Sequence, residues 1–328
     1  MILIISFQDN DHVARVTEHL TRHFEVLDLA SIPTETQVHA YAGRDRDALH
    51  LDLPSGQRID LDRVGAVWNR RIRNFELAPE LADETARTFA WSETTEAVQG
   101  LWYAMDCFWM NHPTADEMSI RKVTQHRVAH QVGLRVPETL VTNGPDEARA
   151  FIERHRQTGV IRKAFRNIPQ APRETLKVGP AELAQIDAVK YAPVIFQEYI
   201  PVALDLRVTV VDGEVFSTAF RSDPAYEVDY RSGIGSAEVF VHDLPDDVRT
   251  RLMRLIDHFG LKFGAVDFRL TPDGEYVFLE VNPAGEYLFC SDRTGQPIPQ
   301  AIAAALDRNA QLHRSATAGS FELREVAG

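Results

Sequence analysis

Three oxygen-bearing side chains, Asp267, Glu280 and Asn282, lie in one stretch of the sequence that reads as a β-hairpin. The dipeptide Asp273-Gly274 is typical of a two-residue hairpin turn, and such a turn places Asp267 directly opposite Glu280. Opposed side chains lie ~4.5–5.5 Å apart at their Cβ atoms. Asn282 follows Glu280 by two residues and therefore belongs to the same face of the strand.

Two opposed carboxylates repel each other unless a proton or a cation neutralises them. With the amide oxygen of Asn282, they form an all-oxygen ligand set that suits Mg²⁺ and leaves positions for phosphate oxygens. The alternative is a solvated hairpin face on which Arg269 pairs with one acid, and the spacing leaves both interpretations open. The other face is apolar, and we expect it in the core: Val266, Phe268, Leu270, Val277, Leu279 and Val281.

Two lysines could bind an anion. Lys163 lies in the apolar stretch 160–165, which reads as a half-buried strand, so its charge needs a phosphate or a carboxylate as partner. Lys122 lies on a helix, where a lysine is usually solvated. His126 and His130 share its face at a spacing that suits a metal, but with no third ligand in view ordinary helix histidines are the simpler interpretation.

Arginines cluster around a second expected hairpin, whose turn is Asp212-Gly213. Asp205 and Arg207 share one face of its first strand, and Arg221 closes the returning strand. Arg231 lies in an irregular stretch that we interpret as a loop over a site. Arginines often clamp a phosphoryl group during its transfer, although each of these could equally pair with a neighbouring acid.

Charge and composition exclude several classes of protein. Lys and Arg number 35 against 48 Asp and Glu, a net charge of −13, which disfavours sequence-independent binding of nucleic acid. We find no apolar run near the ~20 residues of a membrane span. The start MILIISF reads as a buried strand and not as a signal peptide. Cys107 and Cys290 lie far apart, and we expect a cytoplasmic protein.

The elements that must position these residues begin with an α/β unit. Apolar runs at 1–7, 24–29 and 64–68 predict buried strands, His50–Leu61 predicts a hairpin, and 12–23 and 81–109 predict helices. A capping pattern at Thr114 and Glu117 predicts a new helix. We expect an N-terminal α/β domain over 1–112 and a tail over 309–328.

Taken together, these residues resemble the ATP-grasp superfamily over nearly the whole chain. The match rests on an ordered set: Lys122, Lys163, Gln197-Glu198-Tyr199-Ile200, Asp205-Leu206-Arg207, Asp267 and Glu280-Val281-Asn282-Pro283. The resemblance implies an α/β plus α+β fold, in which the N-terminal α/β domain precedes an ATP-grasp fold, with ATP and Mg²⁺ as cofactors. The small central subdomain of that fold would span 113–195 and its C-terminal subdomain 196–308.

The resemblance also implies roles for individual residues. Lys122 and Lys163 would touch the nucleotide phosphates. Gln197 belongs to the same nucleotide-binding segment, in which Glu198 and the backbone of Tyr199 and Ile200 would meet the adenine. Asp205 would face the ribose, while Asp267, Glu280 and Asn282 would hold Mg²⁺. Arg207 and Arg221 would steady the γ-phosphate or an acyl phosphate.

A narrower resemblance is to the microviridin-type peptide-cyclising ligases, the graspetide synthetases. It rests on residues 132–143, Val67-Trp68-Asn69-Arg70-Arg71, Asp229-Tyr230-Arg231 and Asn282-Pro283-Ala284-Gly285-Glu286-Tyr287. It implies a ligase that activates Asp or Glu side chains of a ribosomally made precursor peptide and joins them to Ser, Thr or Lys side chains as esters or amides. A homodimer is possible.

Arg70, Arg71 and Arg73 offer a positive surface for an acidic peptide, although several of these could simply pair with surface acids, above all Arg73. We expect Arg221 and Arg231 to face the peptide carboxylate and the acyl phosphate. Two alternatives are a ligase that adds an amino acid to a protein or small acid, and a regulatory protein that binds ATP without turnover.

Overall fold

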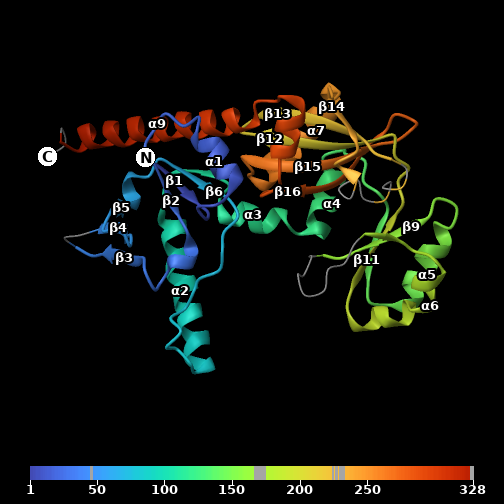
Figure 1. Ribbon diagram of the computed structural model, residues 1–328, viewed down its shortest axis with the longest axis horizontal. Coiled ribbons are helices and arrows are strands. Elements are labelled where there is room, and N and C mark those ends of the chain that lie inside the picture. Colours follow the sequence, from blue (N-terminus) through green and yellow to red (C-terminus); the bar gives the residue numbers. More distant parts are fainter. Residues whose placement is uncertain (45–46, 166–174, 224, 226–227, 229–232, 326–328) are drawn as a thin grey trace.

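The structure is a computed structural model that describes residues 1–44, 47–165, 175–223, 225, 228 and 233–325. In Figure 1 the N-terminal part lies at one end, a five-stranded sheet lies near the other, and a small sheet with two helices projects beside it. The expected fold class is confirmed, since a parallel α/β sheet is followed by two antiparallel sheets with helices packed against them.

The N-terminal sheet is parallel and has the order β2-β1-β6-β7. Its side chains alternate between two apolar clusters: Ile2 and Ile4 of β1 face one, and Leu3 and Ile5 face the other. A strand buried on both faces needs the continuous apolar run that the first residues supply. The elements are β1 (Ile2–Ile5), α1 (Asp11–Thr17), β2 (Phe24–Leu27), η1 (Leu29–Ser31), η2 (Leu61–Arg63), β6 (Ala66–Asn69), α2 (Glu84–Ala104) and β7 (Phe108–Met110).

Two expectations for this region need correction. The helix expected over 81–109 ends at Ala104, and Phe108–Met110 instead forms strand β7, because this aromatic run pairs with β6. The hairpin expected at 50–61 is present, but it has a third strand. Strands β3 (Gln37–Ala42), β4 (Asp47–Asp52) and β5 (Arg58–Asp60) form a small antiparallel sheet.

The small sheet has the order β10-β9-β11-β8, and its helices pack on one face only. Val160 and Phe196 point toward those helices, whereas Ile161, Lys163 and Gln197 line pockets on the opposite side. One face is therefore core and the other is available to a ligand. The elements are β8 (Thr139–Thr142), α5 (Pro145–Arg154), β9 (Val160–Lys163), β10 (Leu176–Lys177), α6 (Pro180–Ala184), η3 (Ile186–Tyr191) and β11 (Val194–Glu198).

The five-stranded sheet is antiparallel, with the order β14-β13-β12-β15-β16. Helix α7 covers one face with Leu252, Leu255 and Phe259, which pack on Leu206 and Phe268. Helices α3 and α4 contribute to the same apolar cluster. The elements are α3 (Pro113–Ser119), α4 (Lys122–Gln131), β12 (Leu204–Val211), β13 (Glu214–Arg221), β14 (Glu238–Val241), α7 (Asp246–Phe259), β15 (Phe263–Leu270), β16 (Tyr276–Asn282) and α8 (Leu288–Thr294).

The C-terminal helix is longer than the sequence suggested. Helix α9 runs without a break over Ile298–Glu325, so residues 309–325 continue a helix where we expected a loose tail. It lies against the N-terminal sheet (Figure 1), and its Ala310 packs so closely on Gly65 that a Cβ there would be 2.7 Å from the Ala310 carbonyl oxygen. Close helix-to-strand packing of this kind requires glycine at position 65.

Asn111 joins the N-terminal domain to the five-stranded sheet. Its side-chain oxygen accepts hydrogen bonds from the backbone of Lys262 and Phe263 at 2.7 and 2.8 Å, and its amide donates to Asp116 at 3.0 Å. The following helix begins at Pro113 with His112 as its cap, so the capping box expected from Thr114 is wrong. Proline fits the first helical position because it needs no hydrogen-bond donor there.

Burial raises the pKa of Asp116 to about 6, although Asn111 and Asn69 both donate hydrogen bonds to its carboxylate. A carboxyl whose pKa is higher in the folded state than in the unfolded chain stabilises the fold most below pH 4. That contribution is lost as the pH rises through about 6.

Asp116→Asn removes this titration. We therefore expect the free energy of unfolding of the variant, relative to the parent, to rise by up to about 3 kcal/mol between pH 4 and pH 7. Urea unfolding at a series of pH values measures the difference. Glu117→Gln, at the exposed neighbouring position, is the control and should leave the parent profile unchanged. Parallel profiles for the parent and Asp116→Asn would contradict a buried, readily protonated carboxyl.

Candidate active site

The turn between β15 and β16 has three residues, not the expected two. The Thr271 amide donates to the Glu275 carbonyl at 3.0 Å, and Leu270 faces Tyr276. Pro272 explains the difference, because it has no N–H to close a two-residue turn opposite Glu275. At Asp212-Gly213 no proline intervenes, and the expected two-residue turn is confirmed by the pairing of Val211 with Glu214.

A β-bulge restores the predicted alignment of the two acids. Phe268 faces Phe278, whereas Asp267 faces Glu280, so β16 carries one extra residue, Leu279. The opposition of Asp267 and Glu280 is therefore confirmed, although the register nearer the turn differs. Leu279 was expected in the core, but Phe278 takes that position at 0% exposed and Leu279 lines the cleft instead.

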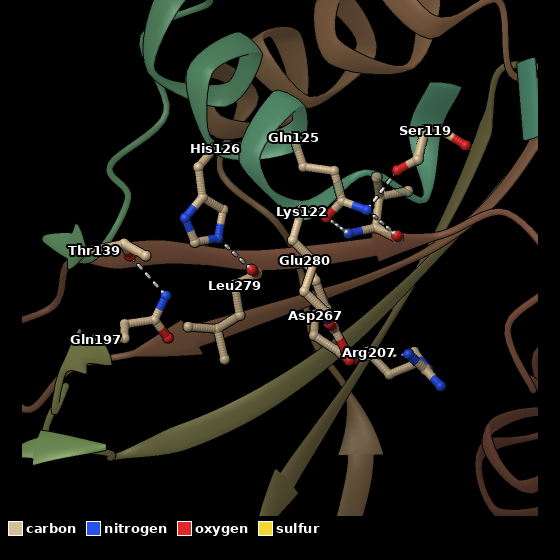
Figure 2. A network of polar contacts seen from close by, with 11 residues as sticks. Ser119, Lys122, Gln125, His126, Thr139, Gln197, Arg207, Asp267, Leu279 and Glu280 are labelled. Atoms are coloured by element: carbon tan, nitrogen blue, oxygen red, sulfur yellow. Dashed lines mark hydrogen bonds and ion pairs between the residues drawn. The ribbon is translucent and has the colours of Figure 1, made fainter. Parts of the chain in front are cut away.

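Four charged side chains form a continuous row across this part of the molecule (Figure 2). Arg207 faces Asp267 on the neighbouring strand, and its Nη1 donates to the Asp267 Oδ1 at 2.8 Å. Lys122, at the start of α4, forms an ion pair with Glu280. Each acid thus has a basic neighbour on its outer side, and the two acids face each other in the middle of the row.

This row is not the solvated face considered as the alternative. The side chains of Arg207 and Asp267 are only 8% and 10% exposed, whereas those of Lys122 and Glu280 are about one quarter exposed. Arg269 pairs with Asp205 at 3.0 Å, and it also donates to the Ile200 carbonyl at 2.9 Å.

Two adjoining pockets of about 60 and 220 Å³ lie between the small sheet and the five-stranded sheet. Lys163, Gln197, Leu279 and Glu280 line both, so these four side chains mark the floor of one cleft. The further lining residues of the smaller pocket include five that were singled out in the sequence: Glu198, Ile200, Asp205, Asp267 and Arg269. The larger pocket also includes Lys122 and His126.

The segment Gln197–Ile200 is held firmly by its surroundings. Gln197 is 1% exposed and donates to the Thr139 hydroxyl at 2.9 Å. The backbone N–H groups of Glu198 and Tyr199 donate to Glu138 and Gly159 at 2.9 and 3.0 Å. The Tyr199 ring packs beneath the Lys177 ammonium, 3.9 Å from the ring centre. The assigned role of this segment in binding adenine stays a prediction.

The other two proposed arginines are not brought into this cleft by the described contacts. Arg221 is exposed, forms an ion pair with Glu238 on β14, and lies over the Phe240 ring at 5.4 Å. Strand alternation assigns it to the face of Ala219, opposite to the face that carries Arg207. Arg231 lies outside the described residues. The catalytic roles proposed for both arginines stay predictions.

The residues at the centre of the site fit a magnesium ion. Asp267 and Glu280 face each other, and Asn282 follows on the same face because it pairs with Ala265, two residues before Asp267. The donors are oxygens only, as Mg²⁺ prefers. The Asn282 side-chain oxygen also accepts the Ala284 amide at 3.0 Å, which fixes the direction of this side chain. The assignment of the three ligands remains a proposal.

His126 faces the same cleft from α4. Its Nε2 lies 3.0 Å from the Leu279 carbonyl oxygen (Figure 2), and burial lowers its pKa, an effect that the nearby charges of Lys163 and Lys122 reinforce. A neutral imidazole that already forms a hydrogen bond with the backbone has a structural role. This observation favours the simpler interpretation of the two helix histidines.

A second charged cluster lies where the N-terminal domain meets the loop after Asn282. Glu286 accepts a hydrogen bond from His12 and forms ion pairs with Arg71 at 2.5 Å and with Arg70 at 3.6 Å. The hydrogen bond from His12 and the two arginines lower the pKa of Glu286 to about 2. Three basic side chains therefore surround one carboxylate of the chain itself.

The sequence contained a signal for this cluster. Arg70 and Arg71 follow β6, and His12 follows β1, which is paired with β6 in parallel. The carboxyl ends of neighbouring parallel strands meet at one edge of the sheet, where ligands commonly bind. Position 71 also adopts φ +48°, a region that non-glycine residues rarely occupy and that concentrates at functional sites. Glu286 itself could not be foreseen as the partner.

Comparison with known proteins decides the family. Residues 1–117 match the model of the MvdD pre-ATP grasp domain, and residues 119–306 match the RimK-like ATP-grasp domain. The chain belongs to the ATP-grasp family. As a member it is a ligase that uses ATP and Mg²⁺.

Solved structures resemble this ATP-grasp ligase over almost its full length. The macrocyclase MdnC from Microcystis aeruginosa, solved with precursor peptide MdnA, is 30% identical, with 93% of this chain and 98% of that chain covered and a TM-score of 0.83. A RiPP-associated ATP-grasp ligase from Chryseobacterium gregarium, solved with ADP and with leader and core peptides, is 26% identical over 93% and 96%, with a TM-score of 0.84.

A curated relative comes from Teredinibacter turnerae. It is a probable alpha-L-glutamate ligase, 27% identical over 223 residues, which are 66% of this chain and 72% of the relative. Among the described residues of the ATP-grasp ligase, no helix is both long and apolar enough to cross a membrane.

We expect Glu280→Gln to reduce ATP turnover at least about 100-fold, because it removes one of the two charged oxygens at the proposed magnesium site. The fold should survive, since a partly exposed ion pair contributes little, and the unfolding temperature should shift by no more than about 4 °C. Phosphate release and thermal unfolding measure the two effects.

Glu275→Gln, in the exposed turn of the same hairpin, is the matched control and should retain full activity. Asp267→Ala is a poorer test, because it leaves Arg207 buried without its partner and should cost about 3–5 kcal/mol of stability. Full turnover in Glu280→Gln would rule out the proposed magnesium site.

Proposed function

We propose that this protein is a peptide macrocyclase that forms ester or amide bonds within a ribosomally made precursor peptide. The observation that carries the proposal is the match to MdnC, a macrocyclase solved with its precursor peptide, because it extends through the N-terminal domain as well as the ATP-grasp domain. The N-terminal domain also matches a family model of its own, and this domain supplies the basic cluster around Glu286.

The cleft between the two sheets is the proposed nucleotide site. Lys163 and Lys122 would bind the phosphates, with the segment 197–200 beside the adenine and Asp205 beside the ribose. Asp267, Glu280 and Asn282 would hold Mg²⁺, which when bound neutralises phosphate charge during transfer. Support comes from the cleft itself, because Lys163, Gln197 and Glu280 line both of its pockets.

The reaction begins when a carboxylate oxygen of an Asp or Glu side chain of the peptide attacks the γ-phosphorus of ATP. The bond to the β,γ-bridging oxygen breaks, ADP leaves, and the carboxyl becomes an acyl phosphate. A hydroxyl or amine of the same peptide then attacks the acyl carbon, loses its proton, and expels phosphate. The protein contributes position and charge, since each step requires the reacting atoms to be held in line.

Arg207 is the basic residue best placed to act near the transferred group. Its guanidinium is nearly buried and donates to Asp267, so it is held in position before any substrate binds. A fixed, desolvated cation stabilises developing phosphate charge more strongly than a mobile exposed one. Arg221 and Arg231 remain further candidates for the acyl phosphate.

The peptide carboxylate would approach through the cluster of His12, Arg70 and Arg71. These three basic side chains already hold one carboxylate, that of Glu286, and Arg71 is about half exposed. A local positive surface is needed because the protein as a whole carries a charge of −13 and would repel an acidic peptide.

A second candidate function is the addition of an amino acid to a carboxylate. The relative from Teredinibacter turnerae and the RimK-like domain favour it. Both functions require the acyl phosphate, and they differ only in the nucleophile, so the product distinguishes them. A regulatory protein without turnover is disfavoured, because the paired acids and their basic partners are intact.

The decisive experiment incubates the protein with ATP, Mg²⁺ and a peptide encoded by a short neighbouring reading frame whose core repeats Thr, Ser or Lys with Asp or Glu. Mass spectrometry should show the loss of one water for each bond formed, with one ADP released per bond. A gain equal to an amino-acid residue would identify the second function and overturn the macrocyclase proposal.

Arg71→Ala should lower kcat/KM for the peptide at least about tenfold and leave the affinity for ATP unchanged, because a lost charge-assisted hydrogen bond contributes roughly 1.5–3 kcal/mol. Arg73→Ala is the matched control, since Arg73 is equally exposed but forms its ion pair with Asp28. Initial rates of dehydrated product, followed by mass spectrometry, measure the effect. Equal losses in the two variants would refute a specific role for Arg71.

A further inference from the structure

The three-stranded sheet of β3, β4 and β5, in the N-terminal domain, carries three potential metal ligands on one face. His39 of β3 lies directly opposite His50 of β4, and Asp52 follows His50 by two residues on the same strand. Alternation along the strand therefore aligns all three side chains on one side of the sheet. Their nitrogen and oxygen ligand atoms all lie within 4.8 Å of one another.

The spacing of two of these atoms already matches a metal site. His39 Nε2 lies 3.4 Å from Asp52 Oδ2. Two ligands that each lie ~2.0–2.2 Å from a tetrahedral Zn²⁺ are separated by roughly 3.3–3.5 Å. No movement of this pair is needed to accept an ion between the two atoms.

The Nε2 atom of His39 is buried, yet it has no hydrogen bond among the residues that the structure describes. A buried polar atom normally has a hydrogen-bond partner or a ligand. The Asp52 oxygen at 3.4 Å is too distant for a hydrogen bond. A metal ion between the two atoms would give the His39 Nε2 a partner.

Arg58 holds the Asp52 carboxylate in position, as the residues around a metal site do for its ligands. Arg58, opposite Asp52 on β5, donates to its two oxygens at 2.6 and 2.8 Å and lowers the pKa of Asp52. The carboxylate is therefore ionised at neutral pH, and each oxygen keeps a second lone pair. A hydrogen bond to a ligating carboxylate from the opposite side is a common feature of metal sites.

We propose that His39, His50 and Asp52 form a site for a first-row transition-metal ion, with Zn²⁺ as the best fit. Two imidazole nitrogens and one carboxylate suit Zn²⁺, whereas the all-oxygen set at Asp267 and Glu280 suits Mg²⁺. The two sites therefore prefer different ions. The rings of His39 and His50 are stacked at 14°, so binding would rotate the His50 ring about χ2 to aim its nitrogen at the ion.

The ion would join β3 to the rest of the domain. Every side chain of β3 is exposed or only partly buried, and a small antiparallel sheet of this kind has little stability of its own. A ligand from β3 and two from β4 would link the strands side by side. The expected consequence is a metal-dependent rise in thermal stability that leaves ATP turnover unchanged.

The test titrates Zn²⁺ into the chelator-treated full chain by calorimetry, with excess Mg²⁺ present to fill the oxygen sites. One Zn²⁺ should bind per chain and should raise the unfolding temperature. His39→Ala and Asp52→Asn should each weaken Zn²⁺ binding at least about tenfold and abolish the stabilisation. Substituted Co²⁺ should show the intense visible absorption of a low-coordinate site in the parent and lose it in His39→Ala.

Two variants serve as controls. His19→Ala removes an exposed histidine elsewhere in the same domain, and His130→Ala removes the i, i+4 partner of His126 on α4. Both should bind Zn²⁺ as the parent does and keep their ATP turnover. Unchanged binding in His39→Ala, or a loss in His130→Ala instead, would overturn the proposal. Because the readouts are binding and stability, neither result depends on the reaction that the enzyme catalyses.

Discussion

The charge row Lys122–Glu280–Asp267–Arg207 is the constraint on which the rest of the site depends. Two acids opposed across a pair of β-strands are tolerated only because each has a basic partner on its outer side. The Arg207–Asp267 pair is almost buried, so removing one partner would leave an uncompensated charge in the interior. The Lys122–Glu280 pair is more exposed, so in the proposed site these two side chains would exchange partners when a nucleotide and Mg²⁺ bind.

Residues from three structural units meet at this row. Arg207 and the two acids come from adjacent strands of the five-stranded sheet, Lys122 comes from the first residue of α4, and Lys163 comes from the open face of the small sheet. The N-terminal domain adds Arg70 and Arg71 at the loop that follows Asn282. Asn111 fixes this arrangement, because its side chain bonds the first residue of β15. The proposed nucleotide and substrate sites would therefore be built from different domains around one hairpin.

Much of this site could be predicted from the sequence, but for reasons that were partly mistaken. The opposition of Asp267 and Glu280 was correct, yet it arises from a turn one residue longer than expected and a bulge that compensates for it. Pro272 indicated the longer turn, because it lacks a donor. Nothing local indicated the bulge at Leu279, since an apolar residue suits the core and a cleft equally well. Ion-pair partners such as Glu286 with Arg71 join residues far apart in the sequence, and only packing decides between them.

The central claim is that the substrate carboxylate attacks ATP and becomes an acyl phosphate. The most direct measurement uses a precursor peptide whose Asp and Glu side-chain carboxylates carry ¹⁸O, incubated with the enzyme, ATP and Mg²⁺. The account predicts one ¹⁸O atom in the released inorganic phosphate for each bond formed, because the bridging oxygen of the acyl phosphate comes from the carboxylate and leaves with phosphate. Inorganic phosphate without ¹⁸O, alongside a dehydrated peptide, would contradict it.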